Sequence, residues 1–413
     1  MKSDFQSYTV EQLIQMDMLE PPMDGNHGSI HPKTSDYVSD GVPFIMANDL
    51  VGGTIDFSSC AHITEKQAST LRKGFSHPGD ILLTHKATIG RTAVVPDNYP
   101  TIILTPQITY YRVKRGIYNR YLKYYFDSAP FQRLFNNWAG SGSTRAYLGI
   151  TAQRKLPIVL PPYDLQVKIS SILRALDDKI ELNNRINENL YKQLEQSFVH
   201  DYLEECPKHS EWELTILDRI TDKFATGLNP RKNFVLGHGS NFYVTIKNMS
   251  NNRIYLDNKC DRVDDAALVK INARSDLRSG DLLFSGIGTI GRTYLIDRPA
   301  NNWNISESVF TIRPSSVVSS EFLYLLLLSK EMQDYAVSNS SGSVQKGIRM
   351  ADLKKYPVIC PAKDYMEKLT SMWRPIIKMI KLNEDEVDKL SEIRNALLPK
   401  IMSGEVDVSE IDL

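Results

Sequence analysis

One motif occurs twice in this chain, and the duplication constrains the fold more than any other feature. Residues 79–92 have the sequence GDILLTHKATIGRT, and residues 280–293, 201 positions later, have the sequence GDLLFSGIGTIGRT. Further matches at nearly the same separation pair Asn48 with Asn248, Cys60 with Cys260, Arg112 with Arg313, Pro157 with Pro357, and Leu182-Asn183 with Leu382-Asn383. This period is far longer than the roughly 20 to 50 residues of solenoid repeats. The sequence therefore predicts two sister domains.

The charge is divided between the two copies and the segments that follow them. The whole chain has 49 basic and 49 acidic side chains. Residues 1–160 nevertheless carry 16 basic and 13 acidic side chains, and residues 206–360 carry 20 and 16. Residues 161–205 carry 5 and 9, and residues 361–413 carry 8 and 11. Locally positive domains with acidic connectors are compatible with a nucleic-acid partner, although the net charge is zero.

Each copy has the pattern of a mixed α and β domain. In the first copy, short β-type runs are expected at residues 42–46, 80–83 and 102–113, separated by glycine and proline. Residues 118–137 have helical spacing and predict one helix. No run of about 18 uncharged apolar residues predicts a membrane span, and no export signal precedes the first copy, so we expect a cytoplasmic protein.

A long helix is expected after each copy. With Ile169 at heptad position a, Asn183 also falls at a, and Asn383 falls at the same position of the second helix. A single polar residue there fixes helix register or partner choice at a cost in stability. The alternative is that Asn183 and Asn383 lie at a solvated edge of the seam. Because neither helix can bury its apolar stripe alone, we expect the two helices to pair, and a pseudo-twofold relation between the copies makes them antiparallel.

The expected fold is therefore α+β, with two pseudo-twofold-related α/β domains separated by two long antiparallel coiled-coil-like helices. The boundaries follow the prolines that end each copy. We assign the first domain to residues 1–162, the central spacer helix to 163–205, the second domain to 206–362 and the C-terminal spacer helix to 363–413.

The sequence contains no recognisable active site. The GIGTIG of residues 286–291 matches a dinucleotide-binding fingerprint, but that fingerprint must open a helix, and residues 292–297 are expected to continue as a strand. His27 and His31 have a possible ligand spacing but lie in a loop, so metal binding is not expected there. We therefore expect no catalytic, cofactor-binding or metal-binding residues.

Basic, amide and hydroxyl side chains beside turns are the remaining candidates for function. Lysine and arginine can neutralise phosphates, and arginine and asparagine can form paired hydrogen bonds with base edges. For each residue a purely structural role is the alternative, and Arg91 and Arg292 could instead pair with Asp80 and Asp281. The candidate DNA-binding residues are Lys86, Thr88, Arg91, Arg145, Lys247, Asn248, Thr289, Arg292, Lys346 and Arg349.

The duplicated motif, the Gly-Ser loops at residues 142–143 and 342–343, the LPIVLPP of residues 156–162 and the two long helices together resemble the specificity subunit of type I restriction-modification enzymes. The resemblance covers essentially the whole chain. The copies also depart from each other, since His85-Lys86 in the first corresponds to Gly286-Ile287 in the second. Base-reading residues differ among members of this family, so none can be transferred to this chain.

The resemblance implies two target-recognition domains that each recognise one half of an interrupted, asymmetric site in double-stranded DNA. It also implies that the helices set the spacing and dock two modification subunits, which carry S-adenosylmethionine and methylate adenine. Two restriction subunits using ATP and Mg could join them, whereas this chain would hold no cofactor. On the helices, Glu181 and Glu188 are our candidate partner-docking residues.

Two other functions are compatible with the residues alone. The chain could be a protein-interaction scaffold or orphan regulator without sequence-specific DNA binding. It could also be an enzyme in its own right, which the missing active site disfavours. Selection of bound DNA sequences in the presence of a modification subunit would discriminate the first alternative, and methyl transfer or cleavage by the isolated chain would reveal the second.

Overall fold

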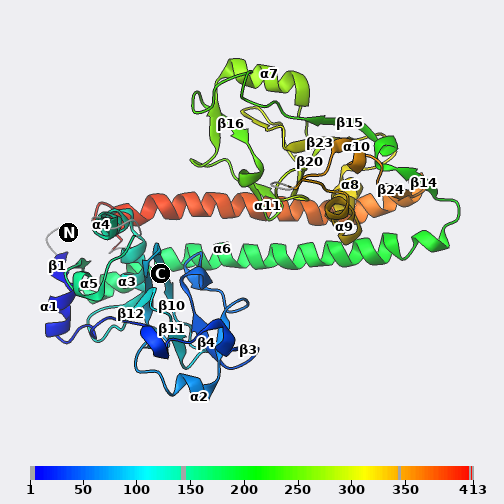
Figure 1. Ribbon diagram of the computed structural model, residues 1–413. Helices are drawn as coiled ribbons and strands as arrows, with labels where there is room; N and C mark the ends of the chain where they lie inside the picture. The colour runs from blue at the N-terminus through cyan, green and yellow to red at the C-terminus, as the bar shows by residue number, and fades with distance from the viewer. Residues whose placement is uncertain (1–4, 141–145, 343–345, 409–410, 412–413) are drawn as a thin grey trace. The chain divides into compact units, whose positions relative to one another are not determined.

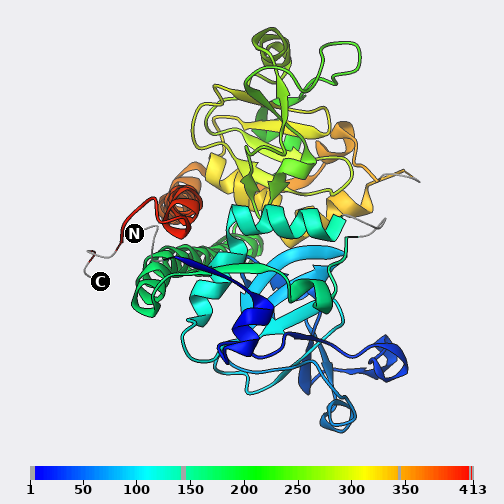
Figure 2. The same ribbon diagram turned by 90° about the vertical axis from the view of Figure 1, so that its left-hand side faces the viewer.

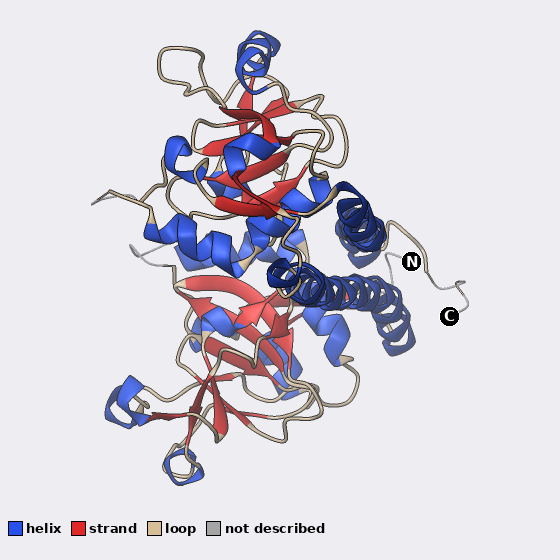
Figure 3. Ribbon diagram, turned by 90° about the vertical axis from the view of Figure 1, so that its right-hand side faces the viewer, coloured by secondary structure: helices blue, strands red, loops and turns tan. Residues whose placement is uncertain are grey.

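A computed structural model describes residues 5–140, 146–342, 346–408 and 411. The chain divides into two compact units, each mixing helices and strands (Figure 3). Unit 1 comprises Met1–Glu181 and Val387–Leu413, and unit 2 comprises Leu182–Glu386. Each unit thus contains one copy of the repeat together with one part of each long helix.

The strands of unit 1 form two main sheets, coloured blue to cyan in Figure 2. Strand β9 is central to the first sheet, in the order β10-β9-β12-β2, and β4 is central to the second, in the order β3-β7-β4-β11-β8. All pairs in these sheets are antiparallel except β4 with β11. The strands are β1 (Gln6–Thr9), β2 (Met23–Asp24), β3 (Tyr37–Val38), β4 (Val42–Ile45), β5 (Leu50–Val51), β6 (Thr54–Ile55), β7 (Ala61–Ile63), β8 (Phe75–Ser76), β9 (Ile81–Lys86), β10 (Thr88–Val94), β11 (Ile102–Leu104), β12 (Ile108–Tyr111) and β13 (Pro157–Leu160).

Unit 2 repeats this plan with a smaller second sheet. Its first sheet has the order β15-β23-β20-β21, and its second has only β19-β16-β22, with β16 and β22 again parallel. In both units the first strand of the copy pairs antiparallel with its last, β1 with β13 and β14 with β24. The strands are β14 (Glu213–Ile216), β15 (Thr221–Thr226), β16 (Asn241–Val244), β17 (Met249–Ser250), β18 (Arg253–Ile254), β19 (Asp261–Val263), β20 (Leu282–Ser285), β21 (Thr293–Leu295), β22 (Trp303–Ile305), β23 (Val309–Pro314) and β24 (Pro357–Cys360).

The short helices also show where the copies have diverged. Helix α7 has 11 residues, whereas its counterpart α2 has four, so the helix beside the second sheet differs in size as the sheet itself does. Unit 1 contains α1 (Val10–Gln15), α2 (Glu65–Ala68), α3 (Asn119–Asp127), α4 (Ala129–Gly140) and α5 (Ile150–Gln153). Unit 2 contains α7 (Asp265–Ser275), α8 (Ser320–Leu328), α9 (Lys330–Ser338) and α10 (Met350–Leu353).

The single helix expected at residues 118–137 is two helices. The chain is extended at Ser128 (φ −62°, ψ 140°), between α3 and α4. Pro130 has no amide hydrogen to donate to the preceding turn, so a helix must restart there. The second copy breaks at the equivalent Ser329, whose hydroxyl accepts a hydrogen bond from the amide of Met332.

The helix that restarts after the break contacts the glycine of the repeated TIGRT sequence, and it does so in both units. Gln132, in the first turn of α4, donates hydrogen bonds to the carbonyls of Gly90 and Phe126, at 2.8 and 2.6 Å. Gln333 makes the same pair of bonds in unit 2, to Gly291 and Leu327. The φ angles of Gly90 and Gly291 are +84° and +92°, a region that favours glycine, so the motif glycine shapes the strand for this contact.

The aspartate of the repeated motif forms a buried ion pair. Arg112 holds Asp80 through two bonds of 2.8 Å, and Arg313 holds Asp281 through bonds of 2.7 and 2.8 Å. The expected alternative partners, Arg91 and Arg292, make no such pair: their guanidinium groups bind backbone carbonyls instead. The alternative that Arg91 pairs with Asp80, and Arg292 with Asp281, was therefore wrong.

The long helices α6 (Tyr163–Phe198) and α11 (Lys363–Met402) are each continuous, and α6 is followed by a π-helical segment, Val199–Leu203 (Figure 1). They begin at the residues that directly follow the Pro-Pro and Pro-Ala ends of the copies. Within unit 2 they are antiparallel, since Asn183 contacts Glu386 and Ser197 contacts Trp373. In unit 1 the two helices are in contact through Asp177 and Arg394, at 2.9 Å.

Candidate nucleic-acid interface

In unit 1, two candidate residues lie at the tip of the β9–β10 hairpin. Lys86 and Thr88 flank Ala87, which adopts a left-handed conformation with φ +64°. The amide of Ala87 donates to the carbonyl of Ala146, and Lys86 forms a β-bridge with Tyr147. The ammonium of Lys86 lies 5.9 Å from the centre of the Tyr147 ring, which is 48% exposed. The tip therefore presents a cation and an aromatic ring together.

The same arrangement recurs in unit 2. Gly288, with φ +80°, occupies the turn position of Ala87, and its amide donates to the carbonyl of Lys346 at 2.8 Å. Thr289 and Lys346 are exposed and share this tip, and Arg349 is exposed immediately before α10. The fold thus brings the hairpin tip next to the segment that follows the Gly-Ser loop. Arg145 lies outside the described residues.

Arg91 and Arg292 occupy a second location, where they connect the hairpin to a 3-10 turn. The guanidinium of Arg91 donates to the carbonyls of Ala47 and Leu50, and that of Arg292 donates to those of Ile246 and Met249. Their backbone amides donate to the hydroxyls of Thr84 and Ser285. The duplicated arginine therefore has a structural role in each copy, and its DNA contact stays a prediction.

Lys247 and Asn248 lie in this 3-10 turn of unit 2, but only Lys247 is exposed. Asn248 is 6% exposed, and its Oδ1 accepts hydrogen bonds from the amide and hydroxyl of Thr245. In unit 1 the corresponding cap is Asp49, which accepts from the amide of Met46. The sequence match of Asn48 with Asn248 was therefore shifted by one residue, and we do not count Asn248 among the surface side chains available to DNA.

His85 and Gly286 occupy equivalent positions, and the size of each residue matches the space that its neighbour across the sheet leaves. A side chain at Gly286 would meet the ring of Phe310, at 2.3 Å from its Cβ, and the residue equivalent to Phe310 in unit 1 is the small Thr109. His85 is fully buried, and its ring hydrogen-bonds the carbonyl of Leu148. Burial lowers the pKa of His85, so its ring adds no charge to the neighbouring tip at neutral pH.

Tyr147 is the side chain at these tips that sequence reasoning missed. It follows Arg145 and Ala146 after the Gly-Ser loop, and only the long-range bridge to Lys86 places it at the hairpin. A lone aromatic residue after a loop carries no signal by itself. An exposed aromatic ring beside a cation can contact base edges in a groove while the cation binds phosphate, which makes Tyr147 a further candidate.

The expected seam asparagines both donate from one long helix to the other in unit 2. Asn183 is 1% exposed and donates to Glu386 at 2.8 Å, and Asn383 donates to Asn187 at 2.8 Å. The two asparagines do not pair with each other. Glu181 and Glu188, our candidate docking residues, are both exposed on α6.

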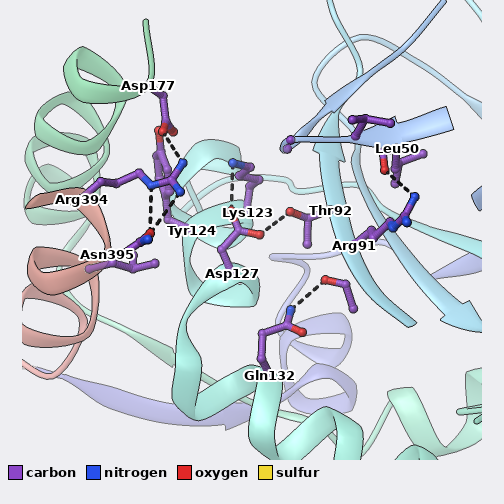
Figure 4. A pocket seen from close by; sticks show the side chains of 15 residues that line it. Leu50, Arg91, Thr92, Lys123, Tyr124, Asp127, Gln132, Asp177, Arg394 and Asn395 are labelled. Carbon is purple, nitrogen blue, oxygen red and sulfur yellow. Dashed lines mark hydrogen bonds and ion pairs between the residues drawn. The ribbon is translucent and has the colours of Figure 1, made fainter. Parts of the chain in front are cut away.

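Unit 1 also contains a cavity of about 540 Å³, lined by both charged and apolar side chains (Figure 4). Figure 4 shows Arg394 paired with Asp177 on one side and Arg91 on the other, with Lys123 paired with Asp127 between them. Each of these cations already has a partner. The described residues contain no group of three or more histidine, cysteine, aspartate or glutamate side chains able to hold a metal ion.

Among the residues that the structure describes, no helix combines the length and apolar character that a bilayer span requires.

Two copies of one mixed α and β domain, each with its part of the two long helices, define a protein with duplicated domains. The sequence comparisons name the family: the type I restriction modification DNA specificity domain matches residues 17–192 and again residues 210–391. The chain belongs to this family, and it is a specificity subunit rather than an enzyme in its own right.

Individual relatives agree with this assignment. The chain is 23% identical over 399 residues to the type I restriction enzyme MjaIX specificity subunit of Methanocaldococcus jannaschii, covering 92% of this chain and 90% of that protein. It is 24% identical over 203 residues to the HindI specificity subunit of Haemophilus influenzae, covering 47% of this chain and 42% of that protein. Its fold resembles the crystal structure of the type I S subunit from M. genitalium, with a TM-score of 0.56, 13% identity and 96% of each chain covered.

Proposed function

We propose that this specificity subunit recognises a bipartite, asymmetric site in double-stranded DNA, with each copy reading one half. The proposal rests on one observation: the two copies share a structural framework but differ in the second sheet and the helix beside it. Both copies keep the buried ion pair, the motif glycine and the glutamine contact. They differ in the second sheet, which has five strands in unit 1 and three in unit 2, and in the adjoining helix. A preserved framework with altered recognition elements suits two different half-sites.

We further propose that the exposed hairpin tips contribute DNA contacts. Lys86 with Thr88 and Tyr147 would do so in the first copy, and Thr289 with Lys346 and Arg349 in the second. The cations would bind phosphates and position the domain, while the hydroxyl and aromatic groups beside them would contact base edges in a groove.

Specificity subunits of type I systems assemble with other subunits and with DNA. The finer proposal is that two modification subunits bind the long helices, near Glu181 and Glu188, and that two restriction subunits can join. In that assembly the modification subunits hold S-adenosylmethionine, the restriction subunits use ATP and Mg, and this chain holds no cofactor. The cytoplasm is the proposed location, because the chromosomal DNA of a bacterial or archaeal cell is found there.

A domain exchange tests the proposal. Residues 1–160 are replaced by the corresponding domain of another specificity subunit, the hybrid is expressed with its modification partner, and methylated sites in the host genome are sequenced. One half of the methylated site should change while the other half is kept. The matched hybrid, with residues 206–360 exchanged, should change the other half. Changes in both halves from either exchange would contradict the assignment of one half to each copy.

Selection of bound sequences from random DNA tests the alternative of a scaffold without sequence-specific binding. The selection includes the modification subunit, since the chain is proposed to work in that assembly. Enrichment of a bipartite motif supports the proposal, and failure to enrich any motif favours the scaffold.

Salt dependence tests the phosphate contacts. Alanine at Lys346 or Arg349 should weaken binding to all sequences alike and lower the slope of log affinity against log salt by about 0.9 for each lost contact. Lys330 is a suitable control, because it is 82% exposed and pairs with Asp334 on the same helix. A slope that falls equally in Lys330→Ala, or that stays unchanged in all three variants, would remove these residues from the interface.

A further inference from the structure

A loop of unit 2, residues 229–240, is held between α7 and β19. The ammonium of Lys270, on α7, donates to the carbonyl of Asn233 at 3.3 Å. The amide of Gly237 donates to the carbonyl of Arg262, on β19, at 2.9 Å. Apolar side chains of the loop also pack against α7 and β19 in one hydrophobic cluster. The loop therefore has a fixed position beside the helix.

Four exposed cations meet where the loop contacts α7. Arg231 and Lys232 come from the loop, directly before Asn233. Lys270 and Arg274 come from α7, where residues four positions apart lie on one face. We call these four cations the basic surface. Of the carboxylates that the structure describes, none forms an ion pair with any of them. The chain itself therefore leaves these four charges without a counter-charge in contact.

The acidic residues of the same segments are engaged elsewhere. Asp264 accepts a hydrogen bond from the amide of Ala267 as the cap of α7, and Asp265 accepts one from Asn241 at 2.8 Å. Both lie at the start of the helix, whereas its two cations lie in the middle and in the last turn. Helix α7 lies at the end of unit 2 away from α11 (Figures 1 and 2). A partner bound along that long helix would therefore not cover the basic surface.

The corresponding region of unit 1 has the opposite charge. The segments compared are residues 26–41 and 64–68 in unit 1 and residues 229–240 and 264–275 in unit 2. Those of unit 1 carry two basic and three acidic side chains, a net charge of −1, and those of unit 2 carry four and two, a net charge of +2. Where Lys270 contacts the loop in unit 2, Gln67 hydrogen-bonds Asp36 in unit 1. The two copies share this location but not its charge.

The phosphates of DNA are the counter-charge that suits the basic surface. B-DNA carries about one negative charge per 1.7 Å of helix axis. Long, exposed lysine and arginine side chains bind these phosphates, which positions a protein on the duplex without reading its sequence. The basic surface belongs to a domain that is proposed to bind DNA, and it lies away from the helix where partner subunits are proposed to bind.

We propose that the basic surface is an additional phosphate-binding site of the second copy, which the first copy lacks. The two copies then contribute unequally to DNA binding, because the second adds affinity that does not depend on sequence. This inference rests on the proposed function, in which both copies bind DNA, and deepens it by assigning this electrostatic affinity to one copy.

Salt dependence of DNA binding tests the inference on the complete chain assembled with its modification subunits. Binding is measured at several salt concentrations to a duplex that contains the methylated site and to a duplex of unrelated sequence. Lys270→Gln with Arg274→Gln, and Arg231→Gln with Lys232→Gln, should each lower the slope of log affinity against log salt by about 1.8, since each phosphate contact contributes about 0.9. The loss should be equal for both duplexes, and the methylated sequence should not change.

A matched control comes from the first copy. Lys33→Gln with Lys66→Gln removes the two cations of the corresponding segments and should leave the slope unchanged. Arg274→Gln alone shows whether a disturbed loop is the cause, because Arg274 forms no hydrogen bond with the described residues; it should lower the slope by about 0.9.

Three outcomes would overturn the inference. The slope could stay unchanged in both second-copy variants, or it could fall equally in the first-copy control. Weakened assembly with the modification subunits at an unchanged slope would identify an acidic protein surface as the partner instead. In each case the unsubstituted complex still binds its site, whereas an unsubstituted complex that binds neither duplex would contradict the proposed function itself.

Discussion

The buried pair of Asp281 and Arg313 gives the clearest stability prediction. Asp281 is 1% exposed, and two short charge-assisted bonds from Arg313 supply its counter-charge. The change Arg313→Met keeps most of the side-chain volume but leaves the carboxylate buried without a cation. Removal of one partner from a buried pair costs about 3–5 kcal/mol. Because the amide of Arg278 still donates to Asp281, we expect a loss near the lower limit, about 3 kcal/mol.

Arg278→Met is the matched control for this measurement. The side chain of Arg278 is 63% exposed and pairs with Asp276 at the surface, so its loss should cost less than about 1 kcal/mol. Urea unfolding followed by tryptophan fluorescence reports chiefly on unit 2, which contains Trp212, Trp303 and Trp373 of the four tryptophans. Equal destabilisation by Arg313→Met and Arg278→Met would show that the buried pair does not stabilise the repeat as we argue.

Three further predictions concern the repeated hairpin. Gly291→Ala should destabilise unit 2 by about 2–3 kcal/mol in urea unfolding, since φ is +92° and the new Cβ would lie 1.8 Å from Oε1 of Gln333; a loss below about 0.5 kcal/mol would contradict this. Ala87→Gly should raise the stability of unit 1 by roughly 0.5–1 kcal/mol, because glycine relieves the left-handed strain that Gly288 avoids, whereas a decrease would show that this residue is unstrained. His85 has a pKa lowered by burial, so its contribution to stability is complete above the pKa of the unfolded chain, about 6.5, and is lost as pH falls below it. Denaturation of unit 1 at pH 5 to 7 should therefore show a slope that His85→Asn reduces by up to about 1.4 kcal/mol per pH unit, and identical slopes would refute this.

The turn chemistry of the repeat could be predicted from the sequence, but its ion pairs could not. Residues 292–297 were expected to continue as a strand rather than to open a helix at a phosphate site, and Thr293–Leu295 forms β21, which pairs with β20. Nothing local distinguishes Arg292 from Arg313 as the partner of Asp281. The pairing of β20 with β23 decides it, by placing Arg313 beside the carboxylate.

The candidate surface residues also divide into those that the sequence predicted correctly and those that it did not. Lys86 and Lys346 were identified from charge beside turns, and both are exposed. Asn248 was identified by the same argument and is buried, because its side chain caps the 3-10 turn by accepting from the amide of Thr245, as Asp49 does from Met46 in unit 1. Tyr147 was missed because its position depends on a β-bridge across 61 residues of chain.

The sequence alone determined that the chain has two sister domains and two long helices, because duplication and heptad spacing are properties of residues at fixed separations along the chain. Only the tertiary structure decided how each domain is fastened to those helices. Tyr124, Asp177 and Arg394 are separated by 53 and 217 positions, and no periodicity connects them. They meet because α3, α6 and α11 pack against one another, and this packing is decided by long-range contacts rather than by spacing along the chain.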